Sequence, residues 1–190
     1  RSHQFFRCGF LIQRGDSNSI YVKNMSVLGI DLGTTYSCVA SCDSKGHVEM
    51  LTFEREKSPT IPSVVAFQDD GTPFVGQKAK NGLMINADKA IDAVKREMNS
   101  EYCKKDIKIN GIFRKVSPIE PSSCILRHLF YNANKTIREI YNDKEASKAV
   151  VTIPAAFNDN QREKTKLAAE LAGIEVLGLL QEPTAAAIAE

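Results

Sequence analysis

The chain has 190 residues, of which 43% are hydrophobic and 25% charged, and its formal net charge is +2. These values are typical of a globular protein with one domain, or with one domain and a tail. The charge is too small and too scattered to indicate nucleic-acid binding. The sequence contains no run of about 18 apolar residues, so it predicts no membrane-spanning helix. We therefore expect neither nucleic acid nor a membrane among its partners.

The number of cysteines is odd, and none of them forms a Cys-x-x-Cys pair, which argues against a disulfide framework and against a zinc site. A reducing compartment follows from this. In that setting, the Asn-x-Ser/Thr matches at Asn24 and Asn134 are expected to be coincidental. Two of the cysteines are four residues apart on one face of a predicted strand, as small core thiols often are. The five are Cys8, Cys38, Cys42, Cys103 and Cys124.

Residues 1–26 differ in composition from the rest, with four basic residues against one acidic residue. An Arg-rich, acid-poor start is compatible with a mitochondrial targeting segment. The alternative, which we favour, is a disordered leader or translated upstream sequence with Met25 as the true start. Because the chain begins with Arg1 and stops at Glu190 inside a helical pattern, we expect it to be a fragment.

The first ordered part is predicted to be antiparallel. Val27–Asp31 has the pattern of a buried strand, Ser37–Asp43 that of a second, and His47–Phe53 that of a third. Asp43–Gly46 supplies the turn residues between the last two. A region rich in Pro and Gly follows, with a short strand at Val64–Phe67.

Two helices are expected in the middle of the chain. Apolar residues at helical spacing predict one from about Ala87 to Met98 and a long one over roughly Ser122–Tyr141. Residues 99–116 between them are charged and poorly periodic. The apolar positions of the two helices are Ala87, Ile91, Val94 and Met98, then Leu126, Leu129, Phe130, Ala133, Ile137 and Ile140.

The last stretch has the clearest pattern. Val150–Ile153 is predicted to be a strand, Gln161–Ala172 a helix and Glu175–Leu180 a second strand, after which Pro183 opens another helix. A strand–helix–strand unit implies parallel pairing. The fold class is therefore α/β, with a mixed sheet and flanking helices.

The strongest candidate site is the segment Gly29-Ile-Asp-Leu-Gly-Thr-Thr-Tyr-Ser37. A buried strand ends at Asp31, and Gly33 allows a tight turn. Consecutive amides in such a turn can form an anion nest that suits phosphates, and a carboxylate beside it can hold Mg²⁺ through water. The alternative is an ordinary hairpin, in which these residues form the turn and bind no ligand. Gly71-x-x-x-x-Gly76-Gln-Lys78 nearly spells a P-loop, but Gln77 stands where Lys belongs, so we reject it.

The segment at Gly29–Ser37 resembles the first phosphate loop of the actin-like ATPase superfamily. Val151–Arg162 and Gln181–Ala189 resemble two signatures of the 70-kDa heat-shock (Hsp70) chaperone family, and the resemblance covers the chain from Val27 onward. It implies an actin-like, ribonuclease H-like lobe with a mixed five-stranded sheet, the first lobe of a nucleotide-binding domain. The implied core comprises residues 27–61 and 117–190, with a small inserted subdomain at 62–116. The second lobe and the peptide-binding domain are not in this sequence.

The same resemblance implies roles for individual residues. Lys95, Glu182 and Asp31 are the catalytic candidates, and Asp31 and Glu182 would hold Mg²⁺ through water. Physically, the Lys95 ammonium would neutralise charge that builds up on a transferring phosphoryl group. From the residues alone, however, Lys95 would be a solvated lysine on a polar helix face, and Glu182 an N-cap carboxylate before Pro183. The candidates for ATP or ADP binding are Gly33, Thr34, Thr35, Tyr36 and Lys95.

Pro154 and Arg162 match residues that relay the nucleotide state to the substrate domain in this family. The alternative is a purely structural interpretation, in which Pro154 ends a strand and Arg162 is an exposed helix residue. The implied partners are unfolded client peptides, J-domain co-chaperones and nucleotide exchange factors. By the same resemblance, Tyr36 is typical of cytosolic and reticular members rather than mitochondrial and bacterial ones. A cytoplasmic location is therefore expected, with a mitochondrial one as the alternative.

The region between Lys95 and the long helix is shorter than is usual in this family, which motivates a second hypothesis. Under the first, the chain is part of an ATPase whose hydrolysis drives peptide binding and release. Under the second, it is a catalytically silent protein that binds co-chaperones. A sugar kinase of the same superfamily is disfavoured by the segments at Val151–Arg162 and Gln181–Ala189. A site between two lobes cannot enclose the nucleotide or exclude water when only one lobe is present. This chain by itself is therefore expected to bind ATP weakly and hydrolyse it negligibly.

Overall fold

The computed structural model describes residues 27–42, 48–53, 58–141 and 145–189. The predictions for residues 1–26 and for the turn at 43–46 lie outside this part of the chain. Most of the predicted strands join in one sheet, the main sheet, in the order β11-β10-β1-β2-β3, with β4 beside β2. Its strands are β1 (Val27–Asp31), β2 (Tyr36–Cys42), β3 (Val48–Met50), β4 (Thr60–Pro62), β10 (Lys148–Ile153) and β11 (Glu175–Gln181).

The main sheet is mixed, as the sequence predicted. β1 pairs antiparallel with β2, whereas β10 runs parallel to both β1 and β11. The connection between the two parallel strands β10 and β11 contains helix α3 (Asp159–Leu171). β1 lies at the centre of the sheet, and its Leu28 and Ile30 are fully buried. Every second residue of the strand therefore enters the core, as the pleat requires. The α/β class with a mixed sheet and flanking helices is confirmed.

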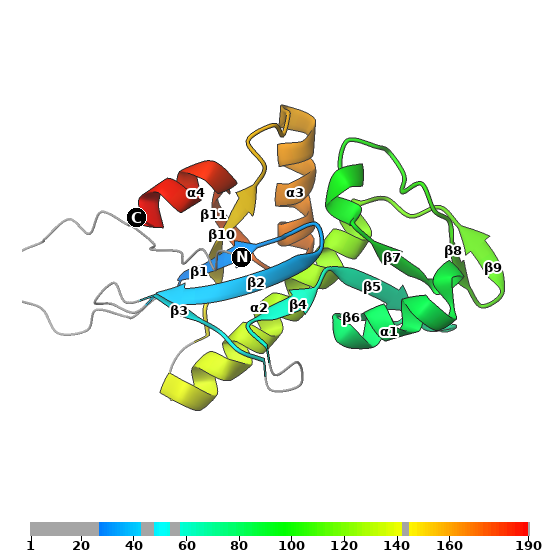
Figure 1. The fold of residues 1–190 in the computed structure, drawn as a ribbon, viewed down its shortest axis with the longest axis horizontal. Coiled ribbons are helices and arrows are strands. Elements are labelled where there is room, and N and C mark those ends of the chain that lie inside the picture. The colour runs from blue at the N-terminus through cyan, green and yellow to red at the C-terminus, as the bar shows by residue number, and fades with distance from the viewer. Residues whose placement is uncertain (1–26, 43–47, 54–57, 142–144, 190) are drawn as a thin grey trace, which may run out of the picture.

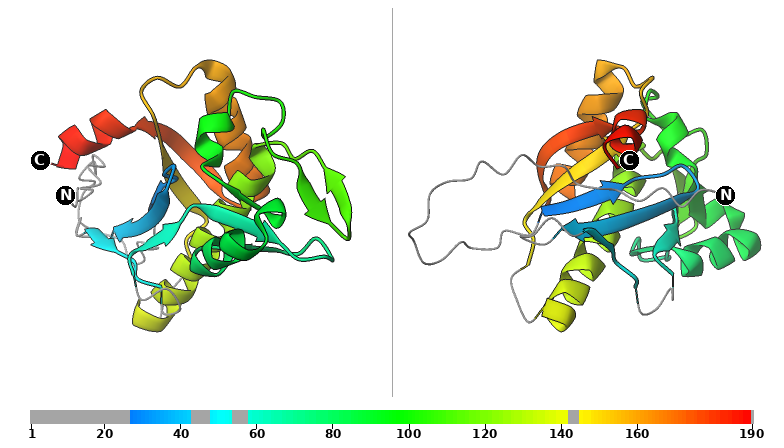
Figure 2. Two further views of the ribbon diagram at one scale, coloured as in Figure 1. Left: turned by 45° about the vertical axis from the view of Figure 1, so that its right-hand side comes forward. Right: turned by 60° about the vertical axis from the view of Figure 1, so that its left-hand side comes forward.

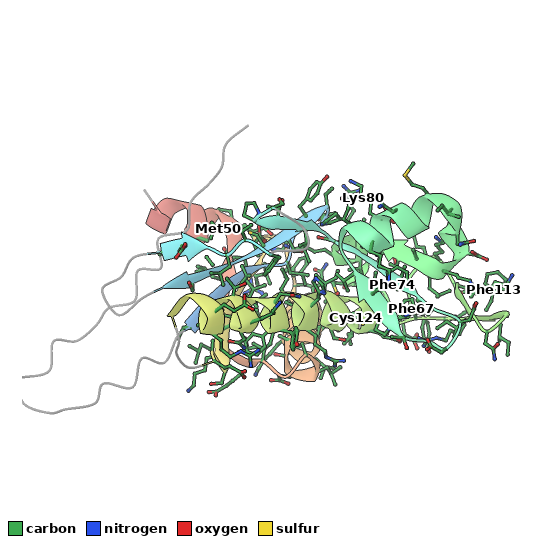
Figure 3. The ribbon with its side chains drawn as sticks, turned by 90° about the horizontal axis from the view of Figure 1, so that it is seen from below. Met50, Phe67, Phe74, Lys80, Phe113 and Cys124 are labelled. Carbon is green, nitrogen blue, oxygen red and sulfur yellow. The ribbon has the colours of Figure 1, made fainter. Side chains whose placement is uncertain are left out.

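Helices cover both faces of the main sheet. Figure 3 shows α2 (Ile119–Tyr141) and α3 on one side of the strands and α4 (Glu182–Ala189) on the other. Within the described ranges, no helix combines the length and the apolar character needed to cross a bilayer. The face of α2 that packs into the core carries the predicted stripe, with Leu126, Leu129, Ala133 and Ile137 buried and Phe130 packed against them.

The start of α2 was predicted three residues too late. The helix begins at Ile119 rather than Ser122, and Pro121 falls in its first turn. Proline is tolerated there because the first amides of a helix have no partner inside it. Ser117 lies just before the helix and accepts hydrogen bonds from the next turn, through its carbonyl from the Glu120 amide at 3.0 Å and through its hydroxyl from the Ile119 amide at 3.4 Å.

A second, smaller group of strands lies beside the main sheet, at the right of Figure 1. This small sheet has the order β6-β5-β7, and helix α1 (Gln77–Ile85) packs on it. A separate hairpin of β8 and β9 extends beyond it (Figure 2, left), and Figure 3 shows Phe113 at its outer end. The strands are β5 (Val64–Phe67), β6 (Pro73–Val75), β7 (Ala90–Asp92), β8 (Ile107–Ile109) and β9 (Ile112–Arg114).

The helix predicted from Ala87 to Met98 is wrong. The segment instead forms a short 3₁₀ turn, strand β7 and a second 3₁₀ turn at Val94–Glu97. Residues 90–92 pair antiparallel with β5, and Ala93 has a positive φ of 49° that breaks any helix. The apolar residues Ile91, Val94 and Met98 are buried as expected. Their spacing was compatible with a helix, but the strand partner decided the backbone.

Two elements of this region were not predicted. Helix α1 follows Gly76 within the stretch that looked rich in turns, and its only buried residue is Ala79. The hairpin of β8 and β9 turns at Asn110-Gly111, both with positive φ. Asn-Gly flanked by apolar residues, here Ile109 and Ile112, is a strong hairpin signal, so this element could have been found in the sequence.

Candidate functional site

The loop between β1 and β2, which we call the β1–β2 loop (residues 33–36), turns sharply at Gly33. A Cβ at this position would lie 1.9 Å from the carbonyl oxygen of Tyr36, a separation that real Cβ atoms do not show. Only glycine therefore fits. Thr35 and Tyr36 are exposed, and within the described residues the amides of Thr34 and Thr35 form no hydrogen bond. Amides in a tight turn that have no acceptor within the protein can receive an anion.

Asp31 ends β1 directly before this loop, and its carboxylate is held from the neighbouring strand. The hydroxyl of Thr152 donates to Asp31 Oδ1 at 2.7 Å, and the two residues are partners in the parallel register of β1 and β10. Thr152 is 3% exposed, so its hydroxyl serves the carboxylate rather than solvent. Sequence reasoning missed Thr152. The available signal was a polar residue in the otherwise apolar run Val150–Ile153.

The three parallel strands β1, β10 and β11 end at the same edge of the main sheet. Asp31 is paired in register with Thr152, and Thr152 with Leu180, so Glu182 follows two residues beyond that row. The topology therefore brings Asp31, Thr152 and the start of α4 to one edge, beside the β1–β2 loop (Figure 1). This edge is where open α/β sheets bind their ligands.

Lys95 lies in the 3₁₀ turn after β7 and reaches Glu182 at the start of α4. Its ammonium lies 2.5 Å from Glu182 Oε1 and forms an ion pair with it. The Lys95 side chain is 5% exposed and that of Glu182 is 44% exposed. Lys95 is therefore not the solvated lysine that its local sequence favoured. Burial of an ammonium is costly without a carboxylate partner, and Glu182 provides one.

The segment after Lys95 is also tied to the main sheet. Asn158 donates from Nδ2 to Asn99 Oδ1 at 3.1 Å, and Lys164 donates from Nζ to the Ser100 carbonyl at 2.7 Å. Asn158 is the N-cap of α3 and forms a capping box with Gln161, and Lys164 lies within the same helix. These contacts fix the backbone that carries Lys95 against the β10–α3 unit.

Pro154 and Arg162, the two relay candidates, meet at one residue between β10 and α3. The amide of Phe157 donates to the Pro154 carbonyl at 3.1 Å, and Arg162 Nε donates to the Phe157 carbonyl at 3.2 Å. Arg162 is thus partly engaged with the loop that Pro154 begins, rather than only an exposed helix residue. The contact makes a connection between the two residues, and their relay role stays a prediction.

Cys38 is the titratable group next to Asp31 across the β1–β2 hairpin, where the two residues are partners. Burial, and secondly the Asp31 carboxylate, raise the pKa of the Cys38 thiol to about 12. A thiol with so high a pKa is protonated at neutral pH and is a poor nucleophile. Cys38 is half-buried and lies outside the buried core cluster, so it is not the core thiol that the sequence predicted. The side chain of Cys42 lies outside the described part of the structure.

The donor chemistry of the edge fits Mg²⁺ better than a transition metal. Among the described residues, no group of three or more His, Cys, Asp and Glu side chains is placed to hold a metal ion. Mg²⁺ does not need such a cage, because it usually keeps several waters and takes one or two carboxylates together with substrate phosphates. Thr152 engages Oδ1 of Asp31, which leaves the second carboxylate oxygen for a metal-bound water.

Comparison with known proteins covers the whole of this edge. The model of the Hsp70 protein family matches residues 27–190, a range that contains Asp31, Lys95, Thr152 and Glu182. The Chaperone protein DnaK of Thermotoga petrophila is 42% identical over 167 residues, or 88% of this chain. The chain spans about a quarter (26%) of the length of that relative. The resemblance found in the sequence is therefore confirmed, and the chain belongs to the Hsp70 family.

Proposed function

We propose that this chain forms one lobe of a nucleotide-binding site and takes ATP or ADP with Mg²⁺ at the carboxyl edge of the main sheet. The observation that carries the proposal is the convergence of Asp31, Thr152 and Glu182 at that edge, beside the tight turn of the β1–β2 loop. Membership of the Hsp70 family supports it. The domain division, with an inserted subdomain at residues 62–116, belongs to the same proposal.

Each residue contributes a different part of the chemistry. The β1–β2 loop (Gly33, Thr34, Thr35 and Tyr36) receives the phosphates, and Asp31 and Glu182 hold Mg²⁺ through its waters. When bound, the ion neutralises negative charge on the phosphates.

Lys95 supplies a buried ammonium that stabilises charge on the transferring phosphoryl group. Its 5% exposure supports this role, because electrostatic stabilisation is stronger where water is excluded.

In the whole protein, we propose that ATP hydrolysis drives the binding and release of unfolded client peptides. The relative in Thermotoga petrophila is named a chaperone, which supports this assignment. J-domain co-chaperones and nucleotide exchange factors are the proposed partners, and Pro154 and Arg162 relay the nucleotide state to the peptide-binding part. The cytoplasmic location indicated by Tyr36 is part of the same proposal.

The direct test is an NMR titration of this chain with Mg-ATP. We expect chemical-shift changes at the amides of Thr34, Thr35 and Tyr36, with weak affinity, about 1 mM. Asp31→Asn should remove the dependence of binding on Mg²⁺ while the spectrum of the α3 region stays unchanged. If saturating Mg-ATP left the amides of the β1–β2 loop unshifted, the proposal would fail.

A catalytically silent protein that binds co-chaperones is the second candidate. It is favoured by the short connection between Lys95 and α2, where the described elements are only β8 and β9, three residues each. The intact mass of the endogenous polypeptide separates the two candidates. A mass far above the 21.0 kDa of this chain favours the ATPase, and Lys95→Ala should then abolish its hydrolysis. A mass near 21 kDa favours the binding protein.

A further inference from the structure

The β1–β2 loop is contacted by a residue at the junction of the two sheets. Ser63 lies between β4 of the main sheet and β5 of the small sheet, and it is 1% exposed. Its amide donates to the Thr35 carbonyl at 2.9 Å, and its hydroxyl lies 2.8 Å from that of Ser37. One buried residue therefore contacts the loop through both its backbone and its side chain.

Ser37 carries this contact on to the glycine of the turn. The Gly33 amide donates to Ser37 Oγ at 3.1 Å, and Ser37 is itself 1% exposed. A hydroxyl has one proton and two acceptor sites, so Ser37 can accept from Gly33 and still bond Ser63. The chain Gly33–Ser37–Ser63 thus satisfies the buried polar groups, and within the described residues no buried side-chain polar atom lacks a partner.

This chain determines which amides the loop presents. The Gly33 amide is used internally, whereas the amides of Thr34 and Thr35 have no acceptor within the described part of the chain. Glycine by itself restricts the backbone least. Without the hydroxyl pair, nothing would hold Ser37 in place to constrain the conformation of Gly33. The pair therefore selects one conformation from the many that this glycine permits.

Helix α1, which packs on the small sheet, holds the other end of the loop at the surface. Lys80 of α1 donates to the Tyr36 hydroxyl at 3.1 Å, and its ammonium lies 5.2 Å from the centre of the Tyr36 ring. Figure 3 shows Lys80 at the end of α1 that is nearest the strands of the main sheet. Lys78 of the same helix lies over Phe74 at 5.1 Å, within the small sheet itself. The two lysines make similar contacts, but only Lys80 reaches the β1–β2 loop.

We propose that the inserted subdomain (residues 62–116) holds the β1–β2 loop in its anion-binding shape, through Ser63 in the interior and Lys80 at the surface. Both are positioning residues: they act on the loop that touches the phosphates. The inference rests on the proposed function, since it concerns the same site. It adds that a movement of the small sheet changes phosphate affinity, because both residues belong to the segment that carries this sheet.

The test compares phosphate-bearing and phosphate-free ligands. Mg-pyrophosphate and adenosine are titrated separately into the wild type, Ser63→Ala, Ser37→Ala and the double variant. We expect each single variant to bind Mg-pyrophosphate about 3- to 10-fold more weakly, the range of one hydrogen bond. The double variant should be no weaker than the worse single variant, since both remove the same bond. Adenosine binding should not change.

Matched variants separate positioning from stability. Ser123→Ala removes another buried serine hydroxyl, which donates to the Glu120 carbonyl within α2, and it should leave pyrophosphate binding unchanged. Lys80→Met should weaken pyrophosphate binding, whereas Lys78→Met should not. Since Lys80 is at the surface, this second pair remains informative even if Ser63→Ala does not fold. Equal affinities for Ser63→Ala, Lys80→Met and their controls would overturn the inference.

Hydrogen exchange of the Gly33 amide tests the inference without any ligand. Ser37→Ala and Ser63→Ala should both accelerate exchange at Gly33, and Ser123→Ala should not. If the wild type binds no pyrophosphate and no Mg-ATP but Gly33 exchange still responds, the proposed function fails and the coupling within the loop stands. If Gly33 exchange is the same in all variants, the coupling is wrong regardless of ligand binding.

Discussion

Lys95 and Glu182 form an ion pair at 2.5 Å across 87 residues of sequence, with the lysine almost fully buried and the glutamate half exposed. Lys95 comes from the short 3₁₀ turn after β7, and Glu182 begins α4. Since the main sheet and the turn after β7 must both be in place to form it, this pair reports on how the two are assembled.

Removal of one partner should destabilise the fold more than removal of both. Glu182→Gln leaves the buried Lys95 ammonium without its carboxylate, so the free energy of unfolding should fall by about 1–3 kcal/mol. Lys95→Met combined with Glu182→Gln should recover part of this loss, because no charge is then buried. Urea denaturation of the two single variants and the double variant measures the difference. Strictly additive losses would show that the pair has no energetic coupling.

Gly33→Ala should disrupt the β1–β2 loop. Its Cβ would overlap the Tyr36 carbonyl, so the backbone must move and the amides of Thr34 and Thr35 lose their arrangement. We expect loss of Mg-pyrophosphate binding, measured by calorimetry. Gly29→Ala is the matched control, because a Cβ there meets nothing within 4 Å and the variant should bind as the wild type does. Equal binding by both variants would contradict the assigned role of the loop.

Thr152→Val should weaken Mg-dependent ATP binding several-fold. The substitution keeps the shape of the side chain and removes the hydroxyl that fixes Asp31, a loss of about 1 kcal/mol. Thr165→Val serves as the control, since Thr165 is equally buried but donates to the Gln161 carbonyl inside α3. Calorimetric titration with Mg-ATP compares the two. A loss in the control as large as that in Thr152→Val would assign the effect to general destabilisation.

Stability should depend on pH through Cys38 at alkaline pH. The folded thiol keeps its proton up to about pH 12, whereas the unfolded thiol loses it near the ordinary value of 9.0. Between these values the folded state binds more protons, so the free energy of unfolding falls as pH rises. Cys38→Ala removes this contribution and should reduce the loss. Denaturation at about pH 8 and about pH 10.5 measures it; the same slope in both proteins would contradict the prediction.

Asn134→Ala should cost about 2 kcal/mol of stability, because it leaves two buried backbone groups without partners. Asn134 accepts from the Ala146 amide at 2.7 Å and donates to the Ala146 carbonyl at 3.0 Å. Asn132→Ala on the same helix is the control, since Asn132 donates to the His128 carbonyl of its own helix. Thermal unfolding of both variants tests the difference. Asn134 is 6% exposed, which agrees with the expectation that its glycosylation match is coincidental.

The parts of the fold predicted correctly are those where local pattern and tertiary structure agree. The strands at Val27–Asp31 and Val64–Phe67 have the predicted bounds, and the third strand near His47–Phe53 is shorter, at Val48–Met50. The helix after Asn158 begins within two residues of its predicted start, because its capping box is encoded locally.

The errors gather in the small sheet. The spacing of Ile91, Val94 and Met98 fits a helix, but pairing with β5 and the positive φ of Ala93 impose a strand and a 3₁₀ turn. A strand as short as β7 has too few residues to show a clear alternation of apolar and polar side chains. Its conformation is therefore decided by the strand it pairs with, β5.

By itself, the sequence determined the residues of the β1–β2 loop, the strands on either side of it and, through three motifs, the family. Those features are encoded by residues that are close together in the sequence, such as Gly33, which the tight turn between β1 and β2 requires. Only the tertiary structure decided that Lys95 is buried against Glu182, that Thr152 holds Asp31 and that Ser63 contacts the loop. These contacts join residues 26 to 121 positions apart, and no local pattern encodes them, because burial and ion pairing depend on what the fold brings alongside.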